Sequence, residues 1–136
     1  MDFVSTRVIT NDINRLARFY ADVTGISPTW YTQDFAELAT PTGALAIGSK
    51  RTMEMFGASA ARAADNHSAI IEFRVEDVDK EYERLDKVIT DIVQPPTTQP
   101  WGNRSLLFRD PDGNLVNFFT PVSPEAIKKH DKAAHR

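Results

Sequence analysis

The sequence predicts an α+β fold made of two copies of one strand, helix and hairpin module, and two internal repeats support this prediction. Residues 8–15 and 73–80 each combine the apolar end of a strand, an aspartate suited to cap a helix and an amphipathic run. The second repeat pairs the turn at residues 40–43 with the turn at residues 110–113, and each turn precedes an apolar strand. Two such patterns about half a chain apart indicate a duplicated module.

The first module is expected to run from a strand through a helix to three short strands. Residues 3–10 have the composition of a strand, and residues 12–23 predict a helix that Gly25 ends. Three further short strands are predicted at residues 29–32, 35–40 and 44–48.

A connector at residues 49–66 has no counterpart in the second copy and is rich in alanine. We expect it to contain one or two helical turns. Met53, Met55 and Phe56 near its start either form an adaptable lid over a pocket or bury the connector, and we favour burial.

The second module repeats the order of the first. We expect a strand at residues 68–75, a helix at 77–87 and strands at 89–93, 105–109 and 115–120. The proline-rich residues 94–102 predict a hairpin tip, because proline cannot donate a hydrogen bond within a central strand. Core-facing residues share one helical spacing in the two helices: Ile13, Ala17 and Tyr20 in the first, and Val78, Tyr82 and Leu85 in the second.

Length and composition indicate a single core. The chain has 136 residues, of which 41% are hydrophobic, and this is enough apolar material for one domain of ordinary size. We therefore predict one domain at residues 1–123, with modules at 1–48 and 67–123 joined by the connector. Residues 124–136 are locally basic and are expected to form a frayed, solvated tail.

Charge and cysteine content exclude several classes of function. The formal net charge is −3 and no long basic run exists, so neither nucleic acid nor a membrane is expected as a partner. The absence of cysteine excludes disulfides and thiolate nucleophiles. Because no signal-peptide pattern or apolar stretch of membrane length is present, we expect a cytoplasmic protein.

The duplicated pattern resembles the vicinal oxygen chelate superfamily, which includes glyoxalase I, extradiol dioxygenases and the bleomycin-resistance proteins. The resemblance covers nearly the whole chain and is most specific at residues 12–20, 100–104 and 108–114. It implies two βαβββ modules whose curved mixed sheets surround a ligand cavity, with the helices outside. It also implies a homodimer.

Metal-dependent members of this superfamily carry His or Glu at two strand positions in each module. Counting from the capping aspartates and the turns places these positions at Ser5, Ile47, Ile70 and Asn117. Aliphatic side chains cannot bind a metal ion, and the Ser and Asn oxygens are weak neutral ligands. The three histidines, His67, His130 and His135, lie elsewhere in the sequence. We therefore predict no metal and no cofactor.

Strand alternation predicts which side chains face the cavity. They lie on the strand faces opposite the helices: Ser5, Arg7, Ser68, Ile70, Glu72, Arg74, Leu115, Asn117 and Phe119. Arg7 and Glu72 occupy equivalent positions in the two modules and either form a structural ion pair or bind a ligand. In the second interpretation, Arg7 or Arg74 binds an anionic or carbonyl group, and Glu72 binds an amine or acts as a base.

Aromatic side chains are expected at the rim of the cavity, where they would stack on a flat ligand: Trp30, Tyr31, Phe35 and Trp101. Each of them could instead belong to the core or to a dimer interface. Trp101 is the strongest candidate for ligand contact, because the chain resembles the bleomycin-resistance proteins around Trp101 and Gly102, where those proteins place an aromatic side chain against the drug.

The predicted function is metal-free binding of a small aromatic, antibiotic-like molecule, which the protein would sequester or carry, as in antibiotic resistance. One alternative is a lyase, isomerase or dioxygenase-type enzyme that uses Glu72 with Arg7, or a metal held by other residues. Another is an accessory or regulatory domain without a ligand. The predicted ligand-binding residues are Ser5, Arg7, Trp30, Phe35, Glu72, Arg74, Trp101, Asn117 and Phe119. No catalytic residue is assigned beyond the candidates Glu72 and Arg7.

Overall fold

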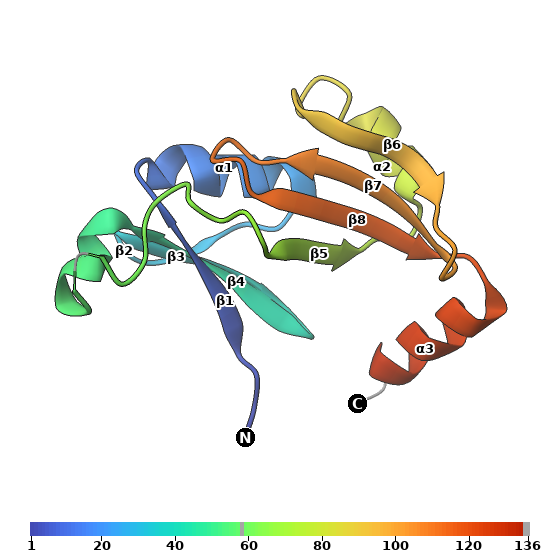
Figure 1. Cartoon of the computed structure of the whole chain (residues 1–136), viewed down its shortest axis with the longest axis horizontal. Helices are drawn as coiled ribbons and strands as arrows, with labels where there is room; N and C mark the ends of the chain where they lie inside the picture. The colour runs from blue at the N-terminus through green and yellow to red at the C-terminus, as the bar shows by residue number, and fades with distance from the viewer. Residues whose placement is uncertain (58, 135–136) are drawn as a thin grey trace. The chain divides into compact units, whose positions relative to one another are not determined.

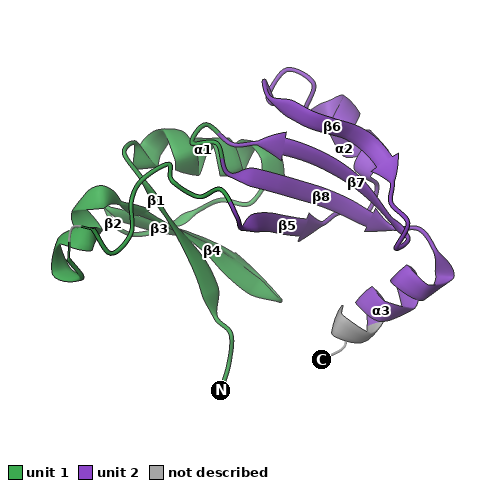
Figure 2. Cartoon of the chain, in the orientation of Figure 1, with its two compact units in different colours: residues 1–67, 111–113 green, residues 68–110, 114–136 purple. Residues whose placement is uncertain are grey.

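The computed structural model describes residues 1–57 and 59–134 of the chain. The chain divides into two compact units, residues 1–67 with 111–113 and residues 68–110 with 114–136 (Figure 2). Each unit contains one βαβββ module, as predicted (Figure 1). Within the described residues, no helix has the length and apolar character needed to cross a membrane.

The first module forms a four-stranded mixed sheet with one long helix. Its elements are β1 (Ser5–Thr10), α1 (Ile13–Thr24), β2 (Thr29–Thr32), β3 (Phe35–Thr40) and β4 (Gly43–Ser49). The strand order is β1-β4-β3-β2, with β1 parallel to β4 and the other pairs antiparallel.

The ends of α1 follow the capping residues in the sequence. The Asp12 side chain accepts a hydrogen bond from the Arg15 backbone N–H at 3.1 Å. Gly25 ends the helix in the left-handed conformation, with φ of 72°, and donates its N–H to the Ala21 carbonyl at 2.9 Å. The predicted stripe of Ile13, Ala17 and Tyr20 is buried, which confirms the core face of this helix.

The second module repeats this arrangement with its own sheet. Its elements are β5 (Ile70–Arg74), α2 (Val78–Arg84), β6 (Ile92–Thr98), β7 (Asn103–Arg109) and β8 (Leu115–Pro121). The strand order is β5-β8-β7-β6, and β5 runs parallel to β8 just as β1 runs parallel to β4. The duplication predicted from the sequence is therefore confirmed.

The helix of the second module is shorter than predicted. It ends at Arg84, and Val78 in the helix and Leu85 at its C-cap are each 1% exposed. Tyr82 is 36% exposed, so its assignment to the core-facing stripe was wrong. Tyr82 lies at the border of the stripe, where a phenol ring can pack its body and keep its hydroxyl in water.

The proline-rich segment differs in part from the prediction. Strand β6 continues to Thr98 and includes Pro95 and Pro96, so the hairpin tip is limited to the turn around Trp101. Strand β6 is the edge of its sheet, and irregularities between Gln94 and Thr97 keep the prolines out of the regular ladder. An edge position and a bulge are the places where a sheet accepts proline, so the expectation that this segment is not a central strand holds.

The C-terminal segment is a helix rather than the frayed tail that we expected. Helix α3 (Pro124–Ala134) begins after Ser123, whose hydroxyl accepts a hydrogen bond from the Ala126 N–H at 3.1 Å. Serine at the cap, proline at the first helical position and an acidic residue in the first turn all favour a helix start. The basic composition of this segment concealed that pattern.

The connector contains the predicted helical turn, a 3₁₀ helix η1 (Lys50–Met55). Met53 is buried, which confirms the favoured interpretation for this residue, but Met55 and Phe56 are 84% and 61% exposed. Asp34 joins the connector to the turn between β2 and β3. Its carboxylate accepts hydrogen bonds from the Ser49 hydroxyl at 2.8 Å and from Arg51 Nη2 at 2.6 Å.

We predict that the Asp34 contacts stabilise the first module in a pH-dependent manner. Hydrogen bonds from Arg51, and then from Ser49, hold the pKa of Asp34 below its ordinary value of 3.8. The stabilisation is therefore fully present above that value and is lost as the pH falls through the lower pKa of the folded state. The difference in thermal unfolding temperature between wild type and D34N should shrink on acidification. The prediction is contradicted if the difference in unfolding temperature between wild type and D34N is the same at pH 7 and at acidic pH. It is also contradicted if D86N, which changes an exposed carboxylate, lowers the unfolding temperature as much as D34N.

Candidate functional site

The second sheet has one covered face and one open face. Helix α2 lies on the face of Arg104 and Thr120, because Asp79 pairs with Arg104 at 2.8 Å and the Thr120 hydroxyl accepts a hydrogen bond from the Val78 N–H at 3.0 Å. The opposite side chains form what we call the open face of the second sheet: Ile70, Glu72 and Arg74 on β5, and Leu115, Asn117 and Phe119 on β8. Strand pairing places these residues directly opposite one another, Glu72 with Asn117 and Arg74 with Phe119.

Glu72 and Asn117 form a polar pair on this open face. Asn117 Nδ2 donates a hydrogen bond to Glu72 Oε2 at 2.8 Å, and the Glu72 side chain remains exposed. Asn117 Oδ1 is buried and receives no hydrogen bond from any described residue. The Asn117 amide therefore holds the Glu72 carboxylate in place. The other carboxylate oxygen, Glu72 Oε1, is available to a ligand.

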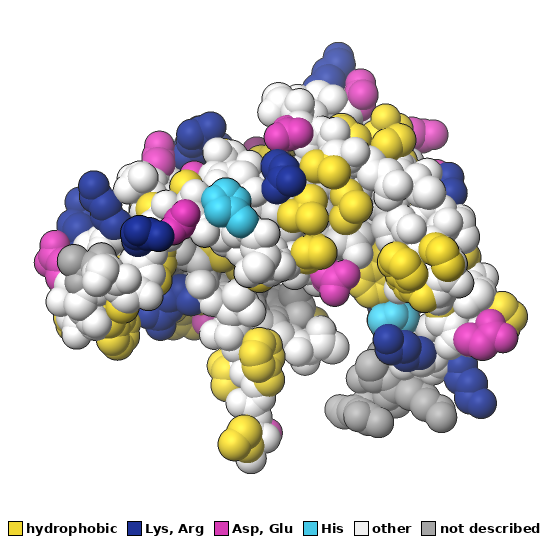
Figure 3. Space-filling model, viewed as in Figure 1, with side chains coloured by type: hydrophobic (Ala, Val, Ile, Leu, Met, Phe, Trp, Pro, Cys, Tyr) yellow, Lys and Arg dark blue, Asp and Glu magenta, His cyan; other side chains and the backbone are white. Residues whose placement is uncertain are grey.

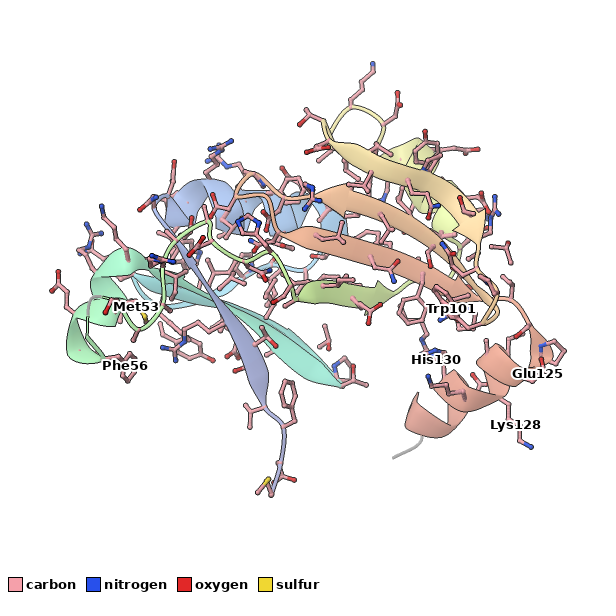
Figure 4. All side chains as sticks on the ribbon, in the orientation of Figure 1. Met53, Phe56, Trp101, Glu125, Lys128 and His130 are labelled. Atoms are coloured by element: carbon pink, nitrogen blue, oxygen red, sulfur yellow. The ribbon has the colours of Figure 1, made fainter. Side chains whose placement is uncertain are left out.

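Helix α3 brings a histidine to the open face that the sequence analysis did not assign to the site. The rings of His130 and Phe119 lie 5.0 Å apart, and Arg74 Nη1 donates a long hydrogen bond, 3.5 Å, to the His130 carbonyl (Figure 4). Burial, followed by the nearby charges of Lys129 and Arg74, lowers the pKa of His130, which favours the neutral ring. The cap residues of α3 were the features that could have revealed this placement.

A pocket of about 370 Å³ lies where the ends of β5 and β8 meet α3. Its charged lining consists of Arg74, Glu76 and Asp131, and its apolar lining includes Val75, Pro121 and Ile127. Hydrophobic side chains lie beside side chains of both charges over this end of the second module (Figure 3). A pocket of this size is sufficient for a small organic molecule.

Trp101 lies in the turn between β6 and β7, at the end of the second module where α3 begins. The Gly102 carbonyl accepts hydrogen bonds from the N–H groups of Val122 and Ser123, at 2.9 and 3.1 Å. The indole is 66% exposed and Figure 4 shows it at the same end as His130. An exposed tryptophan on a turn held by backbone hydrogen bonds is well placed to stack on a ligand.

In the first module, Arg7 and Phe35 lie together on the sheet face opposite α1. The Arg7 guanidinium lies over the Phe35 ring, 4.8 Å from its centre, and the Tyr31 ring lies 5.9 Å from the Phe35 ring. Ser5 is on the same strand face as Arg7 and pairs with Ala44. A cation stacked on an aromatic ring keeps its remaining donors free for an anionic or carbonyl group.

Trp30 does not share this face. It pairs directly with Ala36, which in turn pairs with Ile47, and both partners are fully buried. Directly paired residues point to the same side of a sheet, so Trp30 lies on the α1 side and Phe35 on the opposite side. Adjacent positions on paired strands alternate between faces, so the two side chains lie on opposite faces of the first sheet, and their shared role in ligand binding stays a prediction.

Arg7 and Glu72 each have a partner inside their own module. Arg7 stacks on Phe35, and Glu72 accepts the hydrogen bond from Asn117. These contacts show what holds each charge in place. An ion pair between Arg7 and Glu72 remains a prediction.

Strand pairing corrects one of the four positions at which metal-dependent members carry ligands. In the second module Asn117 pairs with Glu72, and the equivalent pair in the first module is Ala46 with Arg7. The equivalent of Asn117 is therefore Ala46 and not Ile47, whose buried side chain points toward α1.

The corrected set does not fit a divalent cation. It consists of Ser5, Ala46, Ile70 and Asn117, which supply two neutral oxygens and no carboxylate, imidazole or thiolate. Elsewhere in the described part of the chain, no group of three or more His, Asp or Glu residues is arranged to hold a metal ion. His135 lies outside the described residues.

Comparison with known proteins gives consistent matches along the chain. A family model described as "Glyoxalase/Bleomycin resistance protein/Dioxygenase superfamily" matches residues 2–118. The uncharacterized protein YraH of Bacillus subtilis (strain 168) is 27% identical over 125 residues, which cover 88% of this chain and 98% of YraH.

Solved structures show the same fold at lower sequence identity. A glyoxalase/bleomycin resistance protein/dioxygenase family enzyme from Burkholderia phytofirmans PsJN has a TM-score of 0.80 at 16% identity, covering 90% of this chain and 100% of that one. A lactoylglutathione lyase from Agrobacterium tumefaciens has a TM-score of 0.67 at 20% identity, with 88% and 92% covered. At these identities the likeness concerns the fold alone.

Proposed function

Because the chain belongs to the glyoxalase/bleomycin resistance protein/dioxygenase superfamily, we propose that it uses this fold to bind a small, flat, partly polar molecule without a metal ion. The supporting observation is the set of side chains on the sheet faces opposite α1 and α2. The four positions that hold metal ligands in metal-dependent members offer two neutral oxygens here, while stacking and hydrogen-bonding groups lie beside them. We propose a cytoplasmic, homodimeric carrier or sequestering protein, with an antibiotic-like compound as its ligand.

The proposed binding uses two kinds of contact. Phe35 in the first module and Trp101 in the second each supply flat aromatic surface at little entropic cost, since each side chain has only two rotatable bonds. Glu72, fixed by Asn117, accepts a hydrogen bond from a ligand N–H, and Arg7 or Arg74 donates to a carbonyl or anionic group. Stacking contributes most of the affinity in this scheme, and the polar groups orient the ligand.

One observation favours an acid–base enzyme as the second candidate. The His130 ring lies within electrostatic reach of Glu72, and an imidazole beside a carboxyl group is typical of sites that perform general acid–base catalysis. In this alternative Glu72 acts as the base, as expected from the sequence, and His130 replaces Arg7 as its companion.

A thermal-shift screen separates the two functions. The probes are bleomycin, a phenazine and a fluoroquinolone on one side, and Zn²⁺, Ni²⁺, Mn²⁺ and Fe²⁺ on the other. The proposed binder should be stabilised by at least one flat compound, and the shift should persist in EDTA. Stabilisation by metal ions alone would contradict the proposal and favour a metal-dependent enzyme.

We predict that Trp101→Ala weakens binding of the responding probe by at least ~1 kcal/mol, because the exposed indole provides stacking area. The affinity should be measured by titration calorimetry on the wild type and the variant. In a Trp30→Phe background the only remaining indole is Trp101, so quenching of its fluorescence reports direct contact.

The matched control is Trp30→Ala, because Trp30 is also partly exposed but lies on the α1 side of its sheet. This variant should bind the probe like the wild type. Unchanged affinity in Trp101→Ala, with a melting temperature near that of the wild type, would remove Trp101 from the site.

A further inference from the structure

We propose that the pocket between α3 and the ends of β5 and β8 binds an amino-acid group, that is, an ammonium and a carboxylate on one apolar or aromatic body. This inference rests on the proposed function and names the chemical class of its ligand. The pocket has a volume of about 370 Å³, and it brings Arg74, Glu76 and Asp131 together with apolar side chains.

Arg74 is the group that would bind the carboxylate. Its one hydrogen bond within the described part of the chain is the long contact, 3.5 Å, to the His130 carbonyl. It forms no ion pair with any described residue, although two acidic side chains line the same pocket. A guanidinium has donors arranged for two parallel hydrogen bonds to a carboxylate, so Arg74 is available for this contact.

Glu76 and Asp131 are the groups that would bind the ammonium. Neither forms an ion pair with any side chain that the structure describes, up to residue 131, and they come from different segments, the residues just after β5 and helix α3. Two carboxylates and one guanidinium give the pocket an excess of negative charge. A ligand that carries only a carboxylate would be repelled by the two acids, and one that carries only an ammonium would leave the Arg74 guanidinium without a carboxylate partner.

The rest of the pocket is suited to a hydrocarbon body. Val75 and Pro121 contribute apolar lining, and Ile127 is 43% exposed at this wall. Covering a partly exposed isoleucine removes apolar surface from water and favours binding. A zwitterion with an apolar side chain therefore satisfies the opposite charges and the apolar wall together.

The test uses L-phenylalanine and two analogues that each lack one charge. The analogues are 3-phenylpropanoate, without the ammonium, and 2-phenylethylamine, without the carboxylate. Binding should be followed by titration calorimetry and by amide chemical shifts of residues 74–76 and 127–131 in the wild-type protein. We expect L-phenylalanine to bind at least about tenfold more tightly than either analogue.

Two variants locate the site, and each has a matched control. R74Q and D131N should each weaken L-phenylalanine binding at least about tenfold. R18Q and D86N change exposed residues of the same types elsewhere in the chain and should bind like the wild type. The analogue series on the wild type gives an answer even if a variant fails to fold.

The inference is overturned if L-phenylalanine does not bind at millimolar concentration. It is also overturned if 3-phenylpropanoate or 2-phenylethylamine binds equally well, or if folded R74Q and D131N both bind like the wild type. A parallel titration with the phenazine separates this result from the proposed function. Binding of the phenazine without binding of L-phenylalanine rejects the amino-acid pocket and leaves the flat-ligand proposal standing.

Discussion

Replacement of Phe118 by alanine is expected to lower the free energy of unfolding by about 3–5 kcal/mol. Phe118 is 1% exposed and lies at the centre of an aromatic cluster, with edge-to-face contacts to Phe73 at 5.6 Å and to Phe108 at 5.0 Å. Truncation removes the buried ring and leaves a cavity that the surrounding strands cannot fill. Urea denaturation followed by circular dichroism measures the loss.

The control for this prediction is Phe3→Ala. Phe3 is 86% exposed before the start of β1, so removal of its ring should change the stability by less than ~0.5 kcal/mol. A loss below ~1 kcal/mol in Phe118→Ala would mean that the core of the second module does not depend on this cluster.

Replacement of Gly102 by alanine is expected to cost about 3 kcal/mol or more, because it combines backbone strain with a steric clash. Gly102 has a φ of +94°, and a Cβ at this position would overlap Ser123 Oγ and lie 2.7 Å from Ser123 Cβ. The clash is with the cap of α3, so the variant should also displace this helix. Calorimetric unfolding measures the cost, and NMR shifts of His130 report whether its ring leaves Phe119.

Gly113→Ala separates the two causes. Gly113 also has a positive φ, +84°, but a Cβ there would meet nothing within 4 Å. This variant should lose only about 1–2 kcal/mol, the cost of the left-handed conformation. Equal losses in the two variants would show that the close contact between Gly102 and α3 contributes nothing to stability.

The sequence was sufficient for the elements whose causes are local. Asp12 and Asp77 cap their helices as predicted, since each side chain accepts a hydrogen bond from the backbone N–H three residues later. The turn and strand patterns recur in both modules because both copies bury the same faces. Strand alternation also predicted that four side chains share one face of the second sheet, and the register confirms this. They are Glu72, Arg74, Asn117 and Phe119.

Strand pairing identified site positions that a count of residues from the turns did not. The turn before β4 spans fewer residues than the turn before β8, so a count from the turn gave Ile47 where the register gives Ala46. The same strand pairing places Trp30 and Phe35 on opposite faces of the first sheet. A shift of one residue exchanges the two faces of a strand, so site residues on strands are sensitive to small errors in loop length.

By itself, the sequence determined the duplicated module and the N-terminal caps of α1 and α2, because each depends on residue type and short spacing. Only the tertiary structure decided that α3 contacts β8, and that His130 joins Phe119 and Arg74. These contacts join segments far apart in the chain. Their formation depends on packing around Gly102 and Phe119, which a local pattern does not encode.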